Sequence, residues 1–163
     1  MKIFHLVSLL GFLLLLLNSS YLISFGTPSL FYISNVFIHI LIGVGLIPSF
    51  ILLICRLFSH MKYTGKIATV LLIIGIISGL WLMVVGATTP NRWLLISHIM
   101  VTTIGSILLI LHFIWHKPSF IRHSIAKIAG FTLAISLVFP VVVKIYQSYV
   151  PESDYLVQNP IHD

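Results

Sequence analysis

Acidic side chains are almost absent from this sequence, which contains three Asp and Glu residues in 163 positions, against nine Lys and Arg. The chain therefore has few carboxylates that could form the pairs used in hydrolytic catalysis. Cys55 is the only cysteine, which excludes an internal disulfide and the Cys-x-x-Cys-His motif that attaches a c-type haem covalently. The sequence also lacks a phosphate-binding loop, a dinucleotide fingerprint, a His-Glu-x-x-His zinc motif and a nucleophile elbow.

The high share of hydrophobic residues and the low share of charged residues are typical of a membrane protein. Hydrophobic residues make up 59% of the chain and charged residues 7%, whereas an ordinary soluble domain carries roughly 25% charged residues. Because about 20 apolar residues in a helix cross a bilayer, the sequence predicts an all-α integral membrane helical bundle of four or five transmembrane helices in one domain, residues 1–146. The expected spans are residues 3–23, 30–57, 67–86, 93–115 and 128–146, followed by a short extracytoplasmic tail at 147–163. The first span fits either a signal peptide or a retained helix, and we expect the retained helix.

Basic residues are distributed unevenly along the chain and indicate a topology. They gather in the loops after the second and fourth spans, and Lys2 lies on the same side if the helices alternate. The positive-inside rule places these loops and the N-terminus in the cytoplasm and the C-terminus outside, as in a multi-pass protein of the cytoplasmic (inner) cell membrane. Since the formal charge of +6 belongs to the flanks of apolar segments, membrane lipid is an expected partner and nucleic acid is not.

Eight histidines in a chain with three acids are its most informative polar residues. His39 lies about nine residues into the second span and His98 about six residues into the fourth. At a rise of about 1.5 Å per residue, both lie roughly 10 Å below the outer surface. A polar side chain at that depth is costly unless it is paired or coordinated, so we expect these two histidines to face one another.

The same two helices carry histidines near their cytoplasmic ends. From His98, the step of 14 residues to His112 returns to within about 40° of the same helix face, and the step of 18 to His116 returns almost to it. His60 follows His39 by 21 residues and is about 60° off its face, so a helix bend or a loop excursion is needed for pairing. His112 and His116 remain alternatives for one inner position opposite His60.

Two helices that each offer an outer and an inner histidine would provide two bis-histidine sites, which suit haem b. Neutral imidazole is a good iron ligand, and axial coordination by histidine needs no covalent attachment. Gly43 and Gly105 lie on the same helix faces as His39 and His98, where a glycine serves either helix packing or the approach of a flat ring to the backbone. Arg92 at the outer rim would pair with a propionate. The sequence thus predicts one or two haems b.

The stretch from Asn35 to Lys117 resembles the small membrane modules of di-haem b-type cytochromes that pass electrons between a quinone pool and multihaem c-type cytochromes. The shared residues are His39 with Gly43, the exit His60-Met61-Lys62-Tyr63, Ser78-Gly79-Leu80 leading to Gly86, and His98 followed by His112. The resemblance implies that His39, His60, His98 and His112 are the axial iron ligands. It also implies transmembrane electron transfer from quinol or another donor to a c-type or multihaem cytochrome or another subunit of a complex.

A second hypothesis is a small assembly or structural subunit of a respiratory complex, without a stable cofactor. The segment from Arg122 to Tyr146 resembles the last helix of a multi-span family that helps haem–copper oxidases to mature. Stable, stoichiometric haem after purification would favour the cytochrome, and an apo protein that co-purifies with an oxidase would favour the assembly subunit. As a cytochrome, the chain would be an electron-transfer subunit of an oxidoreductase complex and not a stand-alone enzyme, because the cofactor supplies the redox chemistry.

Overall fold

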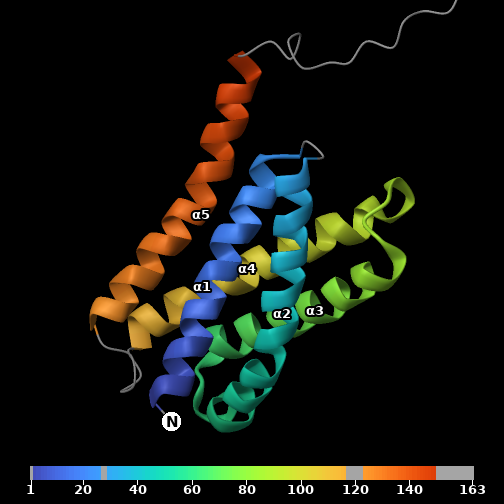
Figure 1. The fold of residues 1–163 in the computed structure, drawn as a ribbon. Coiled ribbons are helices and arrows are strands. Elements are labelled where there is room, and N and C mark those ends of the chain that lie inside the picture. The colour runs from blue at the N-terminus through green and yellow to red at the C-terminus, as the bar shows by residue number, and fades with distance from the viewer. Residues whose placement is uncertain (1, 27–28, 117–122, 150–163) are drawn as a thin grey trace, which may run out of the picture.

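The computed structural model of the protein describes residues 2–26, 29–116 and 123–149. Within these ranges every regular element is helical (Figure 1). The five α-helices are α1 (Lys2–Ser24), α2 (Leu30–Leu57), α3 (Tyr63–Val85), α4 (Arg92–His116) and α5 (His123–Tyr149), with 3₁₀ turns η1 (Phe58–His60) and η2 (Thr89–Asn91). The predicted all-α helical bundle is confirmed.

Each of these five helices is long and apolar enough to cross a membrane. Large apolar side chains cover the outside of the bundle, and no residue of α2 is buried. In water, apolar surface of this extent would drive association, whereas the lipid tails of a bilayer are as apolar as the side chains that they would meet. Exposed Trp93 and Trp115 lie at opposite ends of α4, where interfacial aromatic residues are expected. The fold is therefore that of a multi-pass membrane protein.

Helices α3 and α4 form an antiparallel hairpin and are the most extensively packed pair of helices. Gly86 ends α3 with a positive φ of 74°, a conformation that favours glycine, and its N–H donates to Leu82 O at 2.8 Å. The Asn91 amide donates to Val85 O at 3.0 Å and to Gly86 O at 3.2 Å. The side chain of Asn91, the last residue of η2, therefore satisfies carbonyls at the end of α3, and the short connection holds the two helices side by side.

Helix α4 lies at the centre of the packing because it contributes to two buried clusters. Ile110 belongs to a cluster with α1 and α5, and its other buried members are Leu13, Ala129 and Leu133. The neighbouring Leu109 belongs to a cluster with α3, and its other buried members are Ala68 and Leu72. Consecutive helical residues point about 100° apart, so α4 joins α3 on one side to the α1–α5 pair on another.

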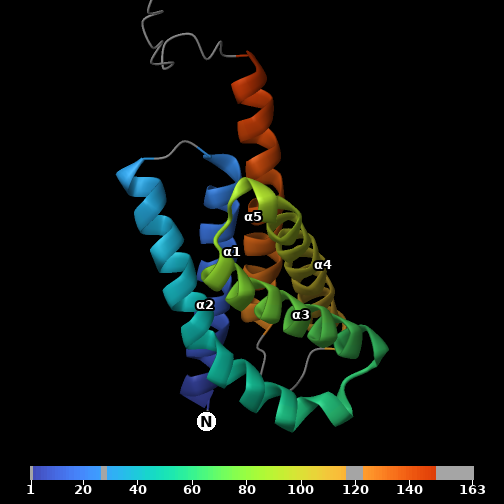
Figure 2. The same ribbon diagram turned by 90° about the vertical axis from the view of Figure 1, so that its right-hand side faces the viewer.

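Helix α2 bends along its length, and its second half passes beneath α3 (Figure 2). Pro48 lies inside this helix and has no N–H to donate to the carbonyl of Val44, which is an ordinary cause of such a bend. Beyond the bend, Phe50 packs against the cluster of Ala68, Leu72 and Leu109. The bend therefore decides where the end of α2, and with it His60, lies relative to α3 and α4.

Helices α3 and α5 begin before the apolar spans predicted from hydropathy, whereas α2 covers the same residues as its predicted span, 30–57. Helix α3 starts at Tyr63 instead of residue 67, and α5 runs from His123 to Tyr149 instead of 128–146. The added turns carry basic residues such as Lys66, whose ammonium lies 5.7 Å from the centre of the Phe58 ring and can reach the membrane surface on its long stem. Hydropathy thus marks the apolar part of a helix and not its ends. Residues 150–163 of the expected tail lie outside the described residues.

Candidate functional site

The structure brings His39 of α2 and His98 of α4 together, as their equal depth in the sequence predicted. The centres of the two imidazole rings are 6.5 Å apart, and the ring planes make an angle of 83°. Both side chains are partly buried. Two histidines that are far apart in the sequence therefore form the polar centre of an otherwise apolar region.

Helix α3 holds the His98 ring in one orientation. Its Nδ1 lies 2.9 Å from Gly75 O and 3.2 Å from Ser78 Oγ. A carbonyl oxygen accepts but cannot donate, so Nδ1 carries the hydrogen and Nε2 keeps its lone pair. A Cβ at Gly79 would lie 2.9 Å from Cε1 of His98, so the ring rests on a stretch of backbone that a larger residue would block.

Helix α1 gives His39 a similar partner. Ser19 Oγ donates to Leu15 O at 2.7 Å and lies 3.4 Å from Nδ1 of His39. Because the hydroxyl hydrogen is used by the carbonyl, Oγ is the acceptor for a hydrogen on Nδ1. His39 and His98 thus both use Nδ1 for a partner on a neighbouring helix, which leaves Nε2 as the nitrogen that can coordinate.

A pair of asparagines continues the polar region on α1 and α2. The amide of Asn18 donates to Asn35 Oδ1 at 2.9 Å, and the amide of Asn35 donates to Phe31 O at 2.8 Å. Asn18 Oδ1 is buried and accepts no hydrogen bond from the described residues. A buried acceptor without a donor is costly, so Asn18 adds a second polar contact between α1 and α2, next to the Ser19–His39 contact in the sequence of α1.

The His39–His98 pair has the chemistry that a haem iron needs. A metal–imidazole bond is about 2 Å long, and the ring adds roughly 1 Å more, so two imidazoles on one ion have centres about 6 Å apart. Ligating histidines almost always donate their other N–H to a carbonyl or similar acceptor, as His98 does to Gly75 O. Gly43 has no atom within 4 Å of where its Cβ would lie, which leaves open space on the His39 side.

Gly105, predicted on the helix face of His98, and Arg92, predicted at the outer rim, lie in different surroundings. A Cβ at Gly105 would lie 3.0 Å from Leu72 Cγ and 3.2 Å from Leu71 Cβ. Gly105 therefore allows α3 to pack closely on α4, which is one of the two roles that the sequence left open. Arg92 is exposed at the first residue of α4, where its guanidinium can meet an anion at the membrane surface.

The inner histidines are arranged differently from the predicted bis-histidine pair. His112 is buried, with 5% of its surface exposed, and its Nδ1 lies 3.1 Å from Thr64 Oγ1. The ring stacks on His116 of the same helix, with ring centres 4.6 Å apart and planes 21° apart. His60 is exposed in η1. Within the described residues, no hydrogen bond or ring contact joins His60 to either of the other two.

Helix α3 carries a repeated feature that sequence reasoning missed. Thr64-Gly65 precedes Ser78-Gly79 by 14 residues, and His98 precedes His112 by the same interval. A Cβ at Gly65 would lie 2.9–3.0 Å from three ring atoms of His112. His98 and His112 therefore each rest on an α3 glycine and have a hydroxyl at Nδ1. The equal spacing of 14 residues on the two antiparallel helices was the sequence signal that could have revealed both histidine–glycine contacts.

The Ser78 hydroxyl can be tested apart from the ligands themselves. If His98 binds an iron, the Ser78→Ala variant is expected to keep its haem but to shift the reduction potential, because hydrogen bonds at Nδ1 tune ligand basicity. Ser78→Thr keeps the hydroxyl and should restore the wild-type value. Potentiometric titration of the purified variants measures the shift, and equal potentials in all three proteins would count against a role for Ser78 in orienting His98.

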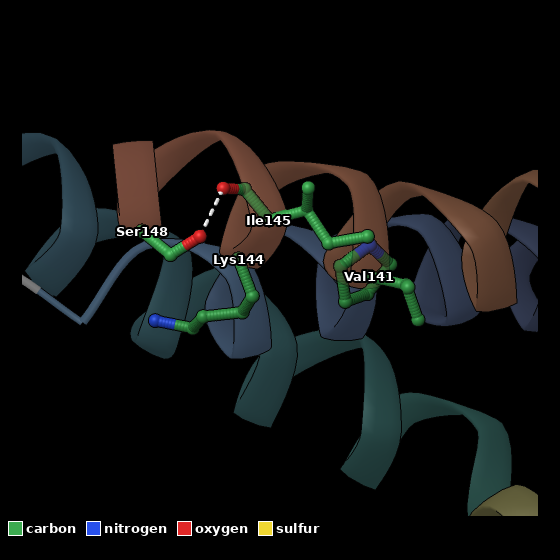
Figure 3. A pocket seen from close by; sticks show the side chains of 5 residues that line it. Val141, Lys144, Ile145 and Ser148 are labelled. Carbon is green, nitrogen blue, oxygen red and sulfur yellow. Dashed lines mark hydrogen bonds between the residues drawn. The ribbon is translucent and has the colours of Figure 1, made fainter. Parts of the chain in front are cut away.

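The surface of α5 contains a hollow that is separate from the histidines (Figure 3). Its lining residues all belong to α5, and they are Pro140, Val141, Lys144, Ile145 and Ser148. Lys144 Nζ donates to Gln147 Oε1 at 3.0 Å, and Ser148 Oγ donates to Ile145 O at 2.6 Å. Lys144 and Ser148 thus already have hydrogen-bond partners on α5 itself, so the hollow offers no convergent polar groups to a ligand.

The fold and the site together define a multi-pass helical membrane protein with paired histidines between its helices. Within the part of the chain that the structure describes, no three His, Cys, Asp or Glu side chains are grouped to hold a metal ion. Coordination would therefore depend on pairs of histidines. No protein-family model, no curated protein and no solved structure matches this chain.

Proposed function

We propose that the protein is a membrane-bound b-type cytochrome subunit that holds a haem between His39 and His98 and passes electrons across or along the membrane. One observation carries the proposal: the two rings lie 6.5 Å apart, and each Nδ1 has a partner on another helix. Two neutral imidazoles with Nε2 available are the donor set that suits haem b. A packing role alone does not require both rings to be oriented in this way.

The chain's own residues would position the cofactor and set its surroundings. The haem supplies one-electron chemistry when it is bound. Gly75 O and Ser78 orient His98, and Ser19 orients His39. The apolar side chains around them exclude water, and low polarity around a redox site is one of the ways in which a protein sets its potential.

The expected topology gives the proposed site its place in an electron-transfer chain. With the basic loops in the cytoplasm, the His39–His98 pair lies toward the outer surface, near the exposed Arg92 at the start of α4. The proposed partners are quinol or another donor and a c-type or multihaem cytochrome or another subunit of the complex. The proposed location is the cytoplasmic (inner) membrane.

The proposal is restricted to one haem per chain. A second haem at the inner level would need His60 beside His112 or His116, and His60 makes no described contact with either. The bend of α2 at Pro48 and the turn η1 direct this histidine to an exposed position. The proposal therefore assigns no cofactor to His60, His112 or His116.

A reduced-minus-oxidised absorbance spectrum of the detergent-purified protein tests the proposal, together with the extracted haem counted per chain. The expected result is a b-type band and about one haem per chain. A folded bundle without haem, expressed with ample haem supply, would contradict the cytochrome and favour the assembly subunit. Two haems per chain would contradict the restriction to one site.

A further inference from the structure

The two lysines at the start of α3, Lys62 and Lys66, have no carboxylate within the described chain that could neutralise them. All three Asp and Glu residues of the sequence follow Tyr149, the last residue of α5, so the ranges 2–26, 29–116 and 123–149 contain none. Helix α5 ends at the opposite end of the bundle from the turn between α2 and α3 (Figures 1 and 2). An anion that neutralises the two lysines is therefore expected from outside the described chain.

The two lysines share one face of α3 with exposed apolar side chains. Successive helical residues turn by about 100°, so one group of α3 residues lies within about 40° of Lys66 around the helix axis. This group consists of Lys62, Val70, Ile73 and Ile77, and the last three form the exposed apolar stripe of α3. Ala68 and Leu72, which pack on Leu109 of α4, lie roughly 120–160° away from Lys66. The lysines and the apolar stripe therefore face away from α4.

The length of the apolar stripe matches the hydrocarbon thickness of one bilayer leaflet. Ile77 follows Lys66 by 11 residues, which is about 16 Å along the helix. One leaflet contributes about half of a hydrocarbon core that is roughly 30 Å thick. We propose that this face of α3 binds one anionic phospholipid, with its phosphate on the ammonium groups of Lys62 and Lys66 and an acyl chain along the apolar stripe.

The surroundings of the two lysines strengthen the attraction for a phosphate. Lys62 is the N-cap residue and no side chain caps α3, so the first N–H groups and the positive end of the helix dipole lie beside the lysines. The ammonium of Lys66 lies 5.7 Å from the centre of the Phe58 ring, a contact that holds it near the turn. Lys62 and His116 both interact electrostatically with His112, so the end of α4 adds a basic side chain near the same place.

A general attraction between basic segments and anionic lipid is the alternative to a defined site, and Lys127 distinguishes the two. Lys127 is exposed near the start of α5, at the same end of the bundle as the α2–α3 turn (Figure 1). In a general attraction each lysine near the membrane surface contributes a similar amount. A defined site on α3 loses affinity when Lys62 or Lys66 is replaced and keeps its affinity when Lys127 is replaced.

Native mass spectrometry of the full-length chain in detergent tests the site by titration with phosphatidylglycerol and with phosphatidylcholine of the same acyl chains. We expect one phosphatidylglycerol per chain to bind at least tenfold more tightly than phosphatidylcholine. Lys62→Gln and Lys66→Gln should each weaken phosphatidylglycerol binding about fivefold, as expected for one lysine at an anionic lipid headgroup. Lys127→Gln is the matched control and should bind like the wild type. Because Lys62 is exposed, Lys62→Gln should keep its helical content in circular dichroism.

Equal weakening in Lys127→Gln would overturn the defined site and favour the general attraction. Wild-type binding by both α3 variants would overturn it as well, and equal binding of the two lipids would show that the anionic headgroup is not recognised. Glycerol 1-phosphate carries the phosphate without acyl chains, so it should not displace the bound lipid at the same concentration. Displacement at that concentration would assign the two lysines to a free phosphate and overturn the lipid site.

Discussion

Replacing His98 with glutamine is expected to remove the haem from the purified protein, and replacing His39 with glutamine is expected to remove the same haem. The two rings lie 6.5 Å apart on different helices, so each supplies one axial ligand, and a single remaining imidazole holds the cofactor far less tightly. We expect haem per chain to fall more than tenfold in each variant. Haem extraction and the reduced-minus-oxidised spectrum measure the loss.

The matched control for these variants is His60→Gln. His60 is exposed in η1, so its replacement should leave the haem content unchanged. Helical content, checked by circular dichroism, distinguishes ligand loss from a failure to fold. Wild-type haem in both His39→Gln and His98→Gln would show that these residues are not the ligands, whatever the haem content of the control.

The Gly79→Ala variant is expected to displace His98 and to destabilise the α3–α4 hairpin. The added Cβ would lie 2.9 Å from Cε1 of His98, which is closer than two carbon atoms can pack. The ring must move away, and its hydrogen bonds to Gly75 O and Ser78 Oγ must lengthen or break. We expect the free energy of unfolding to fall by about 1–3 kcal/mol, as for other overpacked sites, and haem content to fall with it.

Gly45→Ala provides the control for this substitution. No atom lies within 4 Å of where its Cβ would be, and Gly45 is also inside a helix. Alanine there should be neutral or should raise the free energy of unfolding by roughly 0.5–1 kcal/mol, because glycine is the poorer helix former. Thermal unfolding in detergent compares the two variants. If Gly79→Ala unfolds like the wild type and keeps its haem, the close contact with His98 does not position the ring.

Helix existence and the depth of the histidines were predictable from the sequence because both depend on local quantities. Apolar length identifies a membrane-crossing helix, and the rise per residue converts a position in the chain into a depth. His39 and His98 were found in this way, and the structure brings them together. The glycine and hydroxyl spacing on α3 was also present in the sequence, but it has meaning only once α3 and α4 are known to be neighbours.

The sequence by itself determined that this chain is an all-α bundle of membrane-crossing helices with histidines at two depths. Only the tertiary structure decided which histidines meet. His60 is exposed in the turn after α2, whereas His116 stacks on His112. Gly105 faces α3 and serves packing, whereas Gly43 faces open space. The physical reason is that the neighbours of each histidine and glycine depend on the order of the helices and on their rotation about their own axes. Both are set by packing between side chains distant in sequence.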